Sequence, residues 1–197
     1  MSKSDPASAK QERSKTIRWV VTIFFVTIFI SGTISMISDE IMAASGMAVA
    51  FLILLAIVLI GIVFDIIGVS VTSADEKPFH SMAARKVPGA AEAIRLLRNA
   101  ERVSSICCDV IGDICGVVSG SASATIAAQI LTNFEFSWPR IVSLLMSALV
   151  AGMTVGGKAI GKTFAMNSST KIVHGVGKAV YFLRNLFRFS KKKNSTR

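Results

Sequence analysis

Four long apolar stretches, separated by shorter polar segments, dominate the sequence. A helix needs about 17 to 25 consecutive apolar residues to cross a bilayer, and each stretch is close to that length or above it. Because lipid offers no partner for backbone polar groups, stretches of this kind form helices. The pattern predicts an all-α integral membrane protein with four transmembrane helices. The predicted spans are 17–38, 47–71, 103–131 and 141–157, within a single membrane domain at 17–190.

Two further segments place apolar and basic residues on different helical faces. In the first, Ile94 and Leu97 recur at helical spacing, while Arg95 and Arg98 fall on another face. Helices of this type lie in the membrane interface with the basic face toward the headgroups. The predicted segments are cytoplasmic amphipathic helices at 80–102 and 171–189, a cytoplasmic basic tail at 1–16 and a disordered basic tail at 191–197.

Composition and charge agree with a membrane protein. The chain is 52% hydrophobic, with a mean hydropathy of +0.59 and a net charge of +10. Basic residues gather before the first span, between the second and third, and after the fourth, which predicts that both termini are cytoplasmic in the cell (plasma) membrane. The charge favours contact with anionic lipid headgroups. It does not predict nucleic-acid binding, because no stacking aromatics interleave the basic residues.

The sequence offers no catalytic constellation. His80 and His174 are isolated in basic surroundings, with no nucleophile–base pair to build around either of them. The three cysteines, Cys107, Cys108 and Cys115, lie in one predicted span without a CxxC pair, so we expect them to pack as small residues. We therefore predict that the protein is not an enzyme.

Asp109 and Asp113 are the most informative polar residues, because they lie one helical turn apart inside the third predicted span. A charge at that depth costs about 2.5 to 3.5 kcal/mol on the insertion scale, so such residues face a cavity, a partner or an ion path. Small residues at Gly112, Gly116 and Gly120 line a packing seam beside them. The seam predicts either a homodimer or packing against the small residues of the fourth span.

A polar break follows the second span. Ser73, Asp75 and Glu76 offer hard oxygen ligands of the kind that Mg²⁺ prefers, and Pro78 disfavours helix at the residue before it. Simple helix capping is the alternative, and on this motif alone it is the favoured one. Asp65, within the second span, has Lys158 or a neighbouring hydroxyl as its candidate partner.

Several motifs, in their order along the chain, resemble the transmembrane domain of the CorB/CorC and cyclin M (CNNM) magnesium transporters. That domain has a Ser-x-Ser-Glu motif, and 73–76 reads Ser-Ala-Asp-Glu. Its Leu-Leu-x-x-x-Glu-Arg pattern matches 96–102. Two Asn four residues apart in its next helix correspond to the Asp pair in 108–113 when two preceding residues are deleted. Its Gly-Glu-Ile-x-Pro-Lys-Thr motif lies over 157–163, which reads Gly-Lys-Ala-Ile-Gly-Lys-Thr.

The resemblance covers roughly 60–185 and implies transport or binding of Mg²⁺ or a related divalent cation such as Co²⁺. It implies metal ligands at Ser73, Asp75, Glu76, Asp109 and Asp113. The chain departs from the family in its extra first span and in the absence of the regulatory CBS pair, for which we expect no room. Lys158 also stands where the family has a Glu.

Lys158 leaves two hypotheses open. In the first, its side chain extends to the cytoplasmic interface, and the Asp cluster holds Mg²⁺ for transport. In the second, its ammonium group takes the place of the ion and pairs with Asp109 or Asp113. The second hypothesis predicts a non-transporting membrane scaffold, or a regulatory partner of another protein, that kept the fold and lost the ion site.

Overall fold

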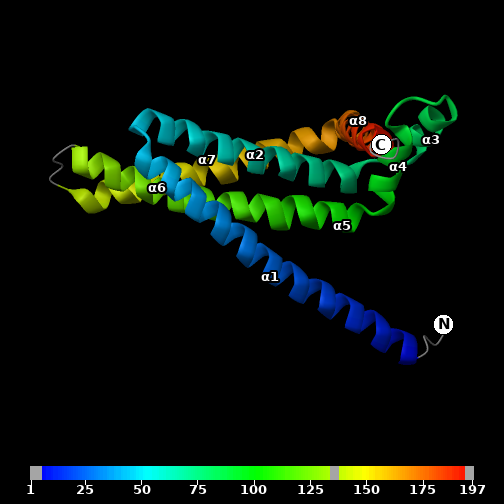
Figure 1. Ribbon diagram of the computed structural model, residues 1–197, viewed down its shortest axis with the longest axis horizontal. Helices are drawn as coiled ribbons and strands as arrows, with labels where there is room; N and C mark the ends of the chain where they lie inside the picture. The colour runs from blue at the N-terminus through cyan, green and yellow to red at the C-terminus, as the bar shows by residue number, and fades with distance from the viewer. Residues whose placement is uncertain (1–5, 134–137, 194–197) are drawn as a thin grey trace.

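The computed structural model describes residues 6–133 and 138–193, and these residues form helices and no strands. Figure 1 shows long helices running side by side, with the N-terminal helix leaving them at an angle. The elements are α1 (Pro6–Ala44), α2 (Met47–Ser73), α3 (Lys77–Ala84), α4 (Ala90–Arg98), α5 (Ala100–Ser104), the π-helix η1 (Ser105–Ile111), α6 (Gly112–Asn133), α7 (Pro139–Asn167) and α8 (Ser169–Lys193).

Four helical segments are long and apolar enough to cross a membrane, which confirms the predicted number of spans. Each contains the corresponding predicted span and extends beyond it. The fourth span is not short, because α7 continues for ten residues past the predicted end at 157. The four segments are Ile17–Met42, Met47–Ser73, Ala100–Asn133 and Pro139–Asn167.

The helix of the first span begins earlier and ends later than predicted. α1 begins at Pro6, so most of the predicted basic tail 1–16 is helical. Proline is favoured at a first helical position, and the Ala, Lys, Gln, Glu and Arg residues that follow it are good helix formers. At its other end α1 includes Asp39 and Glu40, which were expected in a loop. Residues 1–5 and 194–197 of the predicted tails lie outside the described residues.

The prediction of one continuous amphipathic helix at 80–102 is wrong. The structure divides it into α3 and α4, and its last residues belong to α5 at the start of the third span. The break has a local cause, since Lys86 and Gly89 both have positive φ angles, 56° and 85°, around Pro88. The other predicted segment, 171–189, is helical throughout within α8.

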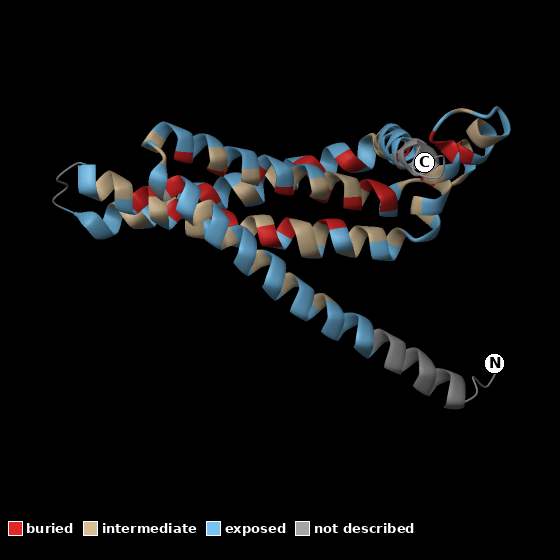
Figure 2. Cartoon of the chain, in the orientation of Figure 1, coloured by how far each residue is buried: buried red, intermediate tan, exposed pale blue. Residues whose placement is uncertain are grey.

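Two hydrophobic clusters hold the bundle together, one toward each end of the long helices (Figure 2). The first joins α1, α2, α6 and α7, and the second joins α2, α3, α4 and α8. The first cluster contains Met42, Ala50, Leu54, Val58, Ala122, Ile126 and Val150. The second contains Val71, Phe79, Ala93 and Val173.

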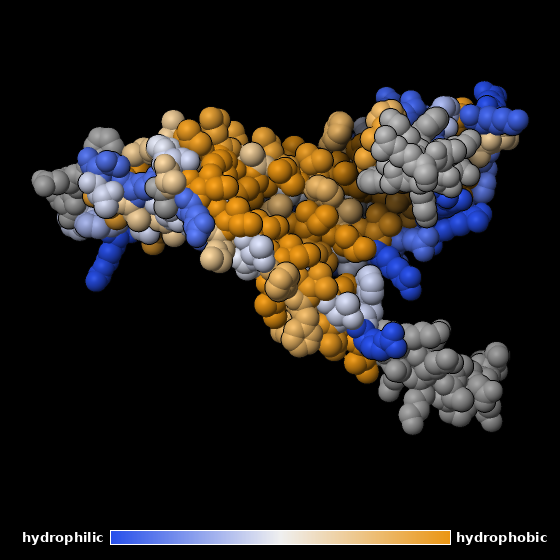
Figure 3. Space-filling model, viewed as in Figure 1, coloured by the Kyte–Doolittle hydropathy of each residue, from blue (hydrophilic) through white to orange (hydrophobic). Residues whose placement is uncertain are grey.

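α8 lies across α4 at the end of the bundle where the second cluster is found. Their contact is close enough to require glycine on both sides, because a Cβ on Gly89 would lie 2.5 Å from the backbone nitrogen of Lys178, and one on Gly177 would lie 2.5 Å from the Gly89 carbonyl oxygen. Figure 3 shows an apolar surface along the long helices and hydrophilic residues at both ends. Exposed apolar side chains of this extent are the surface that a membrane-spanning bundle presents to lipid.

Candidate functional site

Asp113 and Lys158 meet between α6 and α7. The Lys158 Nζ atom lies 3.9 Å from Asp113 Oδ1 and donates a hydrogen bond of 3.4 Å to the Gly112 carbonyl oxygen. The Lys158 side chain is 20% exposed, whereas that of Asp113 is 71% exposed. The ammonium group is therefore held inward on two oxygen atoms, and most of the carboxylate faces outward from the bundle.

Gly112 makes this approach possible because it presents no side chain to α7. A Cβ at this position would lie 3.3 Å from Lys158 Nζ and 3.4 Å from the Cys107 carbonyl oxygen. The separation from Nζ is tighter than ordinary van der Waals contact, so a side chain here would push the ammonium group away by a few tenths of an ångström. Of the three glycines predicted to form the seam, Gly112 is the one that packs within the chain.

Asp109 lies in the π-helix η1, one element before Asp113. The Gly112 amide donates to the Cys107 carbonyl, five residues back, which is the wide turn that defines this helix. π-helical turns inside α-helices are frequent at functional sites. Asp109 is exposed and forms no ion pair within the described part of the chain. The two acids are thus on one helix, but only Asp113 meets Lys158.

Gly116 and Gly120 border an open groove of about 280 Å³ between α6 and α7. No atom lies within 4 Å of a Cβ built on either glycine. The hydroxyl groups of the groove bond to their own helices, with Ser119 donating to Gly116 O at 2.9 Å and Ser123 to Gly120 O at 2.7 Å. On the α6 side the groove is therefore lined by small residues, and the two serine hydroxyls there already have acceptors.

α6 and the preceding η1 both pack closely against α2. A Cβ on Gly61 would lie 2.9 Å from the Cys115 Cβ, and one on Gly68 would overlap the Cys108 sulfur. All three cysteines are free thiols, and Cys107 is buried. The cysteines thus pack as small residues, as expected.

Asp65 lies on α2 beside this seam and is 4% exposed. Its Oδ2 atom is buried and has no hydrogen-bond partner among the described residues. The Cys108 thiol is directed at the Asp65 backbone carbonyl, at 3.7 Å. Lys158, one of its two candidate partners, contacts Asp113 instead.

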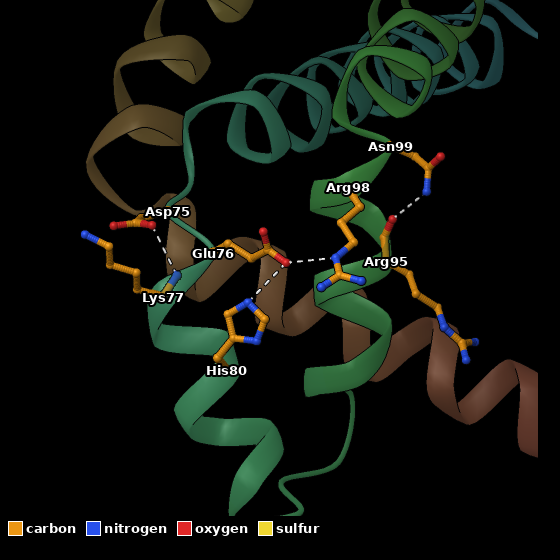
Figure 4. Close-up of polar contacts among 7 residues, drawn as sticks. All are labelled: Asp75, Glu76, Lys77, His80, Arg95, Arg98 and Asn99. Atoms are coloured by element: carbon orange, nitrogen blue, oxygen red, sulfur yellow. Dashed lines mark hydrogen bonds and ion pairs between the residues drawn. The ribbon is translucent and has the colours of Figure 1, made fainter.

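Two of the three ligands predicted at the polar break, Asp75 and Glu76, are engaged in local contacts (Figure 4). Asp75 Oδ1 accepts a hydrogen bond of 3.1 Å from the Lys77 amide at the start of α3. Glu76 Oε1 lies 3.1 Å from Arg98 Nε on α4 and 3.2 Å from His80 Nε2 on α3. Ser73 is the last residue of α2 and is exposed. These contacts fix the connection from α2 to α4. The Glu76 side chain, at the residue before α3, makes no capping hydrogen bond, so the capping alternative stays a prediction.

The structure does not join the polar break to the Asp pair. Cys108 packs on Gly68 of α2, whereas Ser73 lies five residues further along that helix, about 7 Å at 1.5 Å per residue. Within the described residues no group of three or more His, Cys, Asp or Glu side chains is placed to hold a metal ion. The five predicted ligands are thus found as two separate groups.

Sequence reasoning missed the contacts of Glu76 and Glu92 that organise the α3, α4 and α8 layer. Glu76 and His80 are four residues apart at the start of α3, a spacing that could have predicted their contact. Glu92 on α4 lies 3.7 Å from Arg184 on α8, and its side chain is only 12% exposed. No pattern in the sequence joins Glu92 to Arg184, because their contact depends on the way α8 crosses α4.

The four spans, the apolar surface along them and the polar residues at their ends define a multi-pass membrane protein. Comparison with protein-family models, with curated proteins and with solved structures found no match to this chain. Its functional assignment therefore depends on the geometry around Asp113 and Lys158.

Proposed function

We propose that the protein is a non-transporting membrane scaffold or regulatory partner of CorB/CorC-like architecture. The observation that carries this proposal is the position of Lys158, whose Nζ atom contacts both the Gly112 carbonyl and Asp113. A carbonyl oxygen and a carboxylate are ligands that a hard divalent cation takes in proteins. Here a tethered ammonium group contacts them in its place.

Electrostatics support this proposal. A fixed positive charge beside Asp113 opposes the approach of a second cation, and the opposition is stronger in an apolar span than in water. At the polar break, the Asp75 carboxylate accepts from the Lys77 amide, and the Glu76 carboxylate contacts His80 and Arg98. Both groups of candidate ligands therefore already carry a positively charged or hydrogen-bond-donating partner.

The distribution of basic residues indicates how the protein is oriented in the membrane. In this proposal both termini are cytoplasmic in the plasma membrane, and α3, α4 and α8 form a basic layer against anionic headgroups. The open groove at Gly116 and Gly120 serves homodimer formation, since small residues let a second helix approach closely. A different protein partner in the same groove is consistent with a regulatory role.

The test is Mg²⁺ flux into proteoliposomes that contain an indicator dye. The wild type is expected to show no flux. Lys158→Glu, which restores an acid at this position, is expected to gain Mg²⁺ binding or flux because it removes the competing ammonium group. Lys162→Glu is the matched control, since Lys162 lies one turn further along α7, is exposed and makes no ion pair with a described residue. Flux in the wild type that is lost in Asp109→Asn/Asp113→Asn would contradict the proposal.

That contrary result would support the second candidate function, transport of Mg²⁺ or Co²⁺ by the wild type. Two observations favour this candidate. Asp113 is 71% exposed at a long separation from Lys158, and Asp109 has no cation beside it among the described residues. In this alternative Lys158 moves to the interface during transport and releases the acids to the ion.

A further inference from the structure

Three contacts attach the C-terminal part of α1, from Ser35 to Met42, to α6. The Ser35 and Ser121 hydroxyls lie 3.2 Å apart, Thr125 donates to Asp39 Oδ1 at 3.5 Å, and Gln129 Nε2 donates to the Met42 carbonyl at 2.8 Å. The two partners differ in residue number by 86, 86 and 87. A constant offset means that the helices run parallel and in register over this length.

The same offset continues through the part of α1 that is not in contact. It pairs Ser31 with Val117 and Thr27 with Asp113. Because α6 is a regular α-helix from Gly112 onward, the register holds as far as Asp113. Thr27 and Ser31 belong to the face of α1 that carries Ser35 and Asp39, since these positions are four residues apart.

In the structure the N-terminal part of α1, which contains Thr27 and Ser31, diverges from the bundle (Figure 1). No residue from Ile17 to Ile41 is buried. The hydroxyls of Thr27 and Ser31 form no hydrogen bond with the described residues, whereas Thr22 and Thr33 on other faces bond to their own helix at 2.7 and 2.8 Å. Opposite them, Val117 is 62% exposed. The α6 side of this register therefore lies open, and Thr27 and Ser31 on α1 are half-buried without a hydrogen-bond partner among the described residues.

We propose that α1 closes along α6 and that Thr27 then donates a hydrogen bond to Asp113, which makes Thr27 a further residue of the acidic site. This inference rests on the proposed function only in taking Asp113 as the acid of that site. A carboxylate left exposed within an apolar span is costly, and a hydroxyl donor reduces that cost. Closure also covers Val117 and Ser31.

The fold holds the elements that this movement needs. Ser31-Gly32 lies between the attached and the divergent parts of α1, and Gly/Ser pairs are among the usual places where helices bend. No atom lies within 4 Å of a Cβ built on Gly32. At the inner end the Arg102 guanidinium lies 5.8 Å from the ring centroid of Trp19, a cation–π contact that limits how far α1 diverges.

Disulfide cross-linking in liposomes tests the closure. The background is the full chain with Cys107, Cys108 and Cys115 changed to Ala, used only if its thermal unfolding remains cooperative. The test pairs are Ser31→Cys/Val117→Cys and Thr27→Cys/Asp113→Cys. The positive control is Ser35→Cys/Ser121→Cys, at the existing contact. The negative control is Ile30→Cys/Val117→Cys, because Ile30 is one residue from Ser31 and on another face.

With copper phenanthroline as the oxidant, the Ser31/Val117 pair is expected to cross-link within one chain to the extent of the positive control. The Thr27/Asp113 pair, which lacks the hydrogen bond that favours closure, is expected to cross-link less, but more than the negative control. The Ser31/Val117 pair keeps Asp113, so adding Asp113→Asn is expected to reduce its cross-linking. Equal yields from Ile30 and Ser31, or cross-links only between chains, would overturn the closure. So would cross-linking of the positive control alone. None of these results depends on ion flux, so failure of the closure is distinguishable from failure of the proposed function.

Discussion

Glu76 and Asp113 are both acids that the sequence marks as possible metal ligands, yet the structure treats them differently. Glu76 follows the polar end of α2 and accepts from two groups, Arg98 at 3.1 Å and His80 at 3.2 Å. Asp113 is the second residue of α6, within an apolar span, and among the described residues it has one cationic neighbour, Lys158, at 3.9 Å. Side-chain exposure follows the same order, 37% against 71%.

The difference in the number of partners is the reverse of what solvation alone would favour. Water stabilises a carboxylate at the end of a span, whereas lipid does not, so the acid with more need of partners has fewer of them. Glu76 is explained by its role in fixing α3 against α4. Within the described part of the chain, the Asp113 carboxylate lacks a close cation or hydrogen-bond donor. The proposals for Lys158 and Thr27 each concern how this carboxylate is stabilised.

The largest expected effect comes from removing the cationic partner that the structure places beside Asp113. Lys158→Met leaves the carboxylate without this cation and the Gly112 carbonyl without its side-chain donor. We expect a loss of about 1–3 kcal/mol of stability, as for an unsatisfied polar group in a protein interior. Thermal unfolding of the purified protein in detergent measures it.

The controls use the same assay. Lys162→Met is expected to leave the melting temperature nearly unchanged, because the exposed Lys162 makes no ion pair with a described residue. Lys158→Met/Asp113→Asn is expected to recover part of the loss, since it removes the unpaired charge as well. An equal loss from Lys158→Met and Lys162→Met would show that Asp113 and Lys158 are not coupled.

A smaller effect on stability is expected at Glu76, the acid that has two partners. Glu76→Gln removes the charge that attracts both His80 and Arg98, but these contacts are partly exposed, and exposed ion pairs are worth about 0.2–1 kcal/mol. The loss is expected to shrink at high salt because solvent-exposed charges are screened. Unfolding measured at low and high ionic strength checks this. A salt-independent loss larger than that of Lys158→Met would invert the comparison.

The smallest effect is expected for Asp109→Asn. Asp109 is exposed and has no ion pair with a described residue, so its removal costs no contact. We expect a change within about 0.5 kcal/mol, as for most exposed substitutions. The measurement is again thermal unfolding, with Asp113→Asn as the matched variant one turn away. A clear destabilisation by Asp109→Asn would mean that this carboxylate has a partner, such as a bound cation or a second chain.

Hydropathy was sufficient to predict the four spans, because apolar stretches of this length have few other stable states. It was not sufficient for their ends: α1 begins at Pro6 and α7 runs to Asn167, since good helix formers continue a helix after hydropathy falls. Pro88 and Gly89 mark the break between α3 and α4, whereas the basic periodicity across 80–102 predicts one continuous helix.

The candidate site was predicted less well, because its geometry depends on how helices pack. Sequence reasoning named Asp113 and Lys158 as a possible pair, and the structure brings them to 3.9 Å. The grouping of Ser73, Asp75 and Glu76 with the Asp pair came from the family resemblance, and the structure leaves the two groups apart. The register that relates Thr27 to Asp113 is a property of two packed helices, which no single segment encodes.

The parallel contact of α1 with α6 also sets an order of events during synthesis. Ser35 precedes its partner Ser121 by 86 residues, so at 5–20 residues per second roughly 4–17 s separate their emergence. The first helix therefore enters the bilayer and waits there before its partner exists. During that time the backbone bonds of Thr22 and Thr33 keep those hydroxyls satisfied. The remaining polar face of α1 has no protein partner in the bilayer until α6 is made.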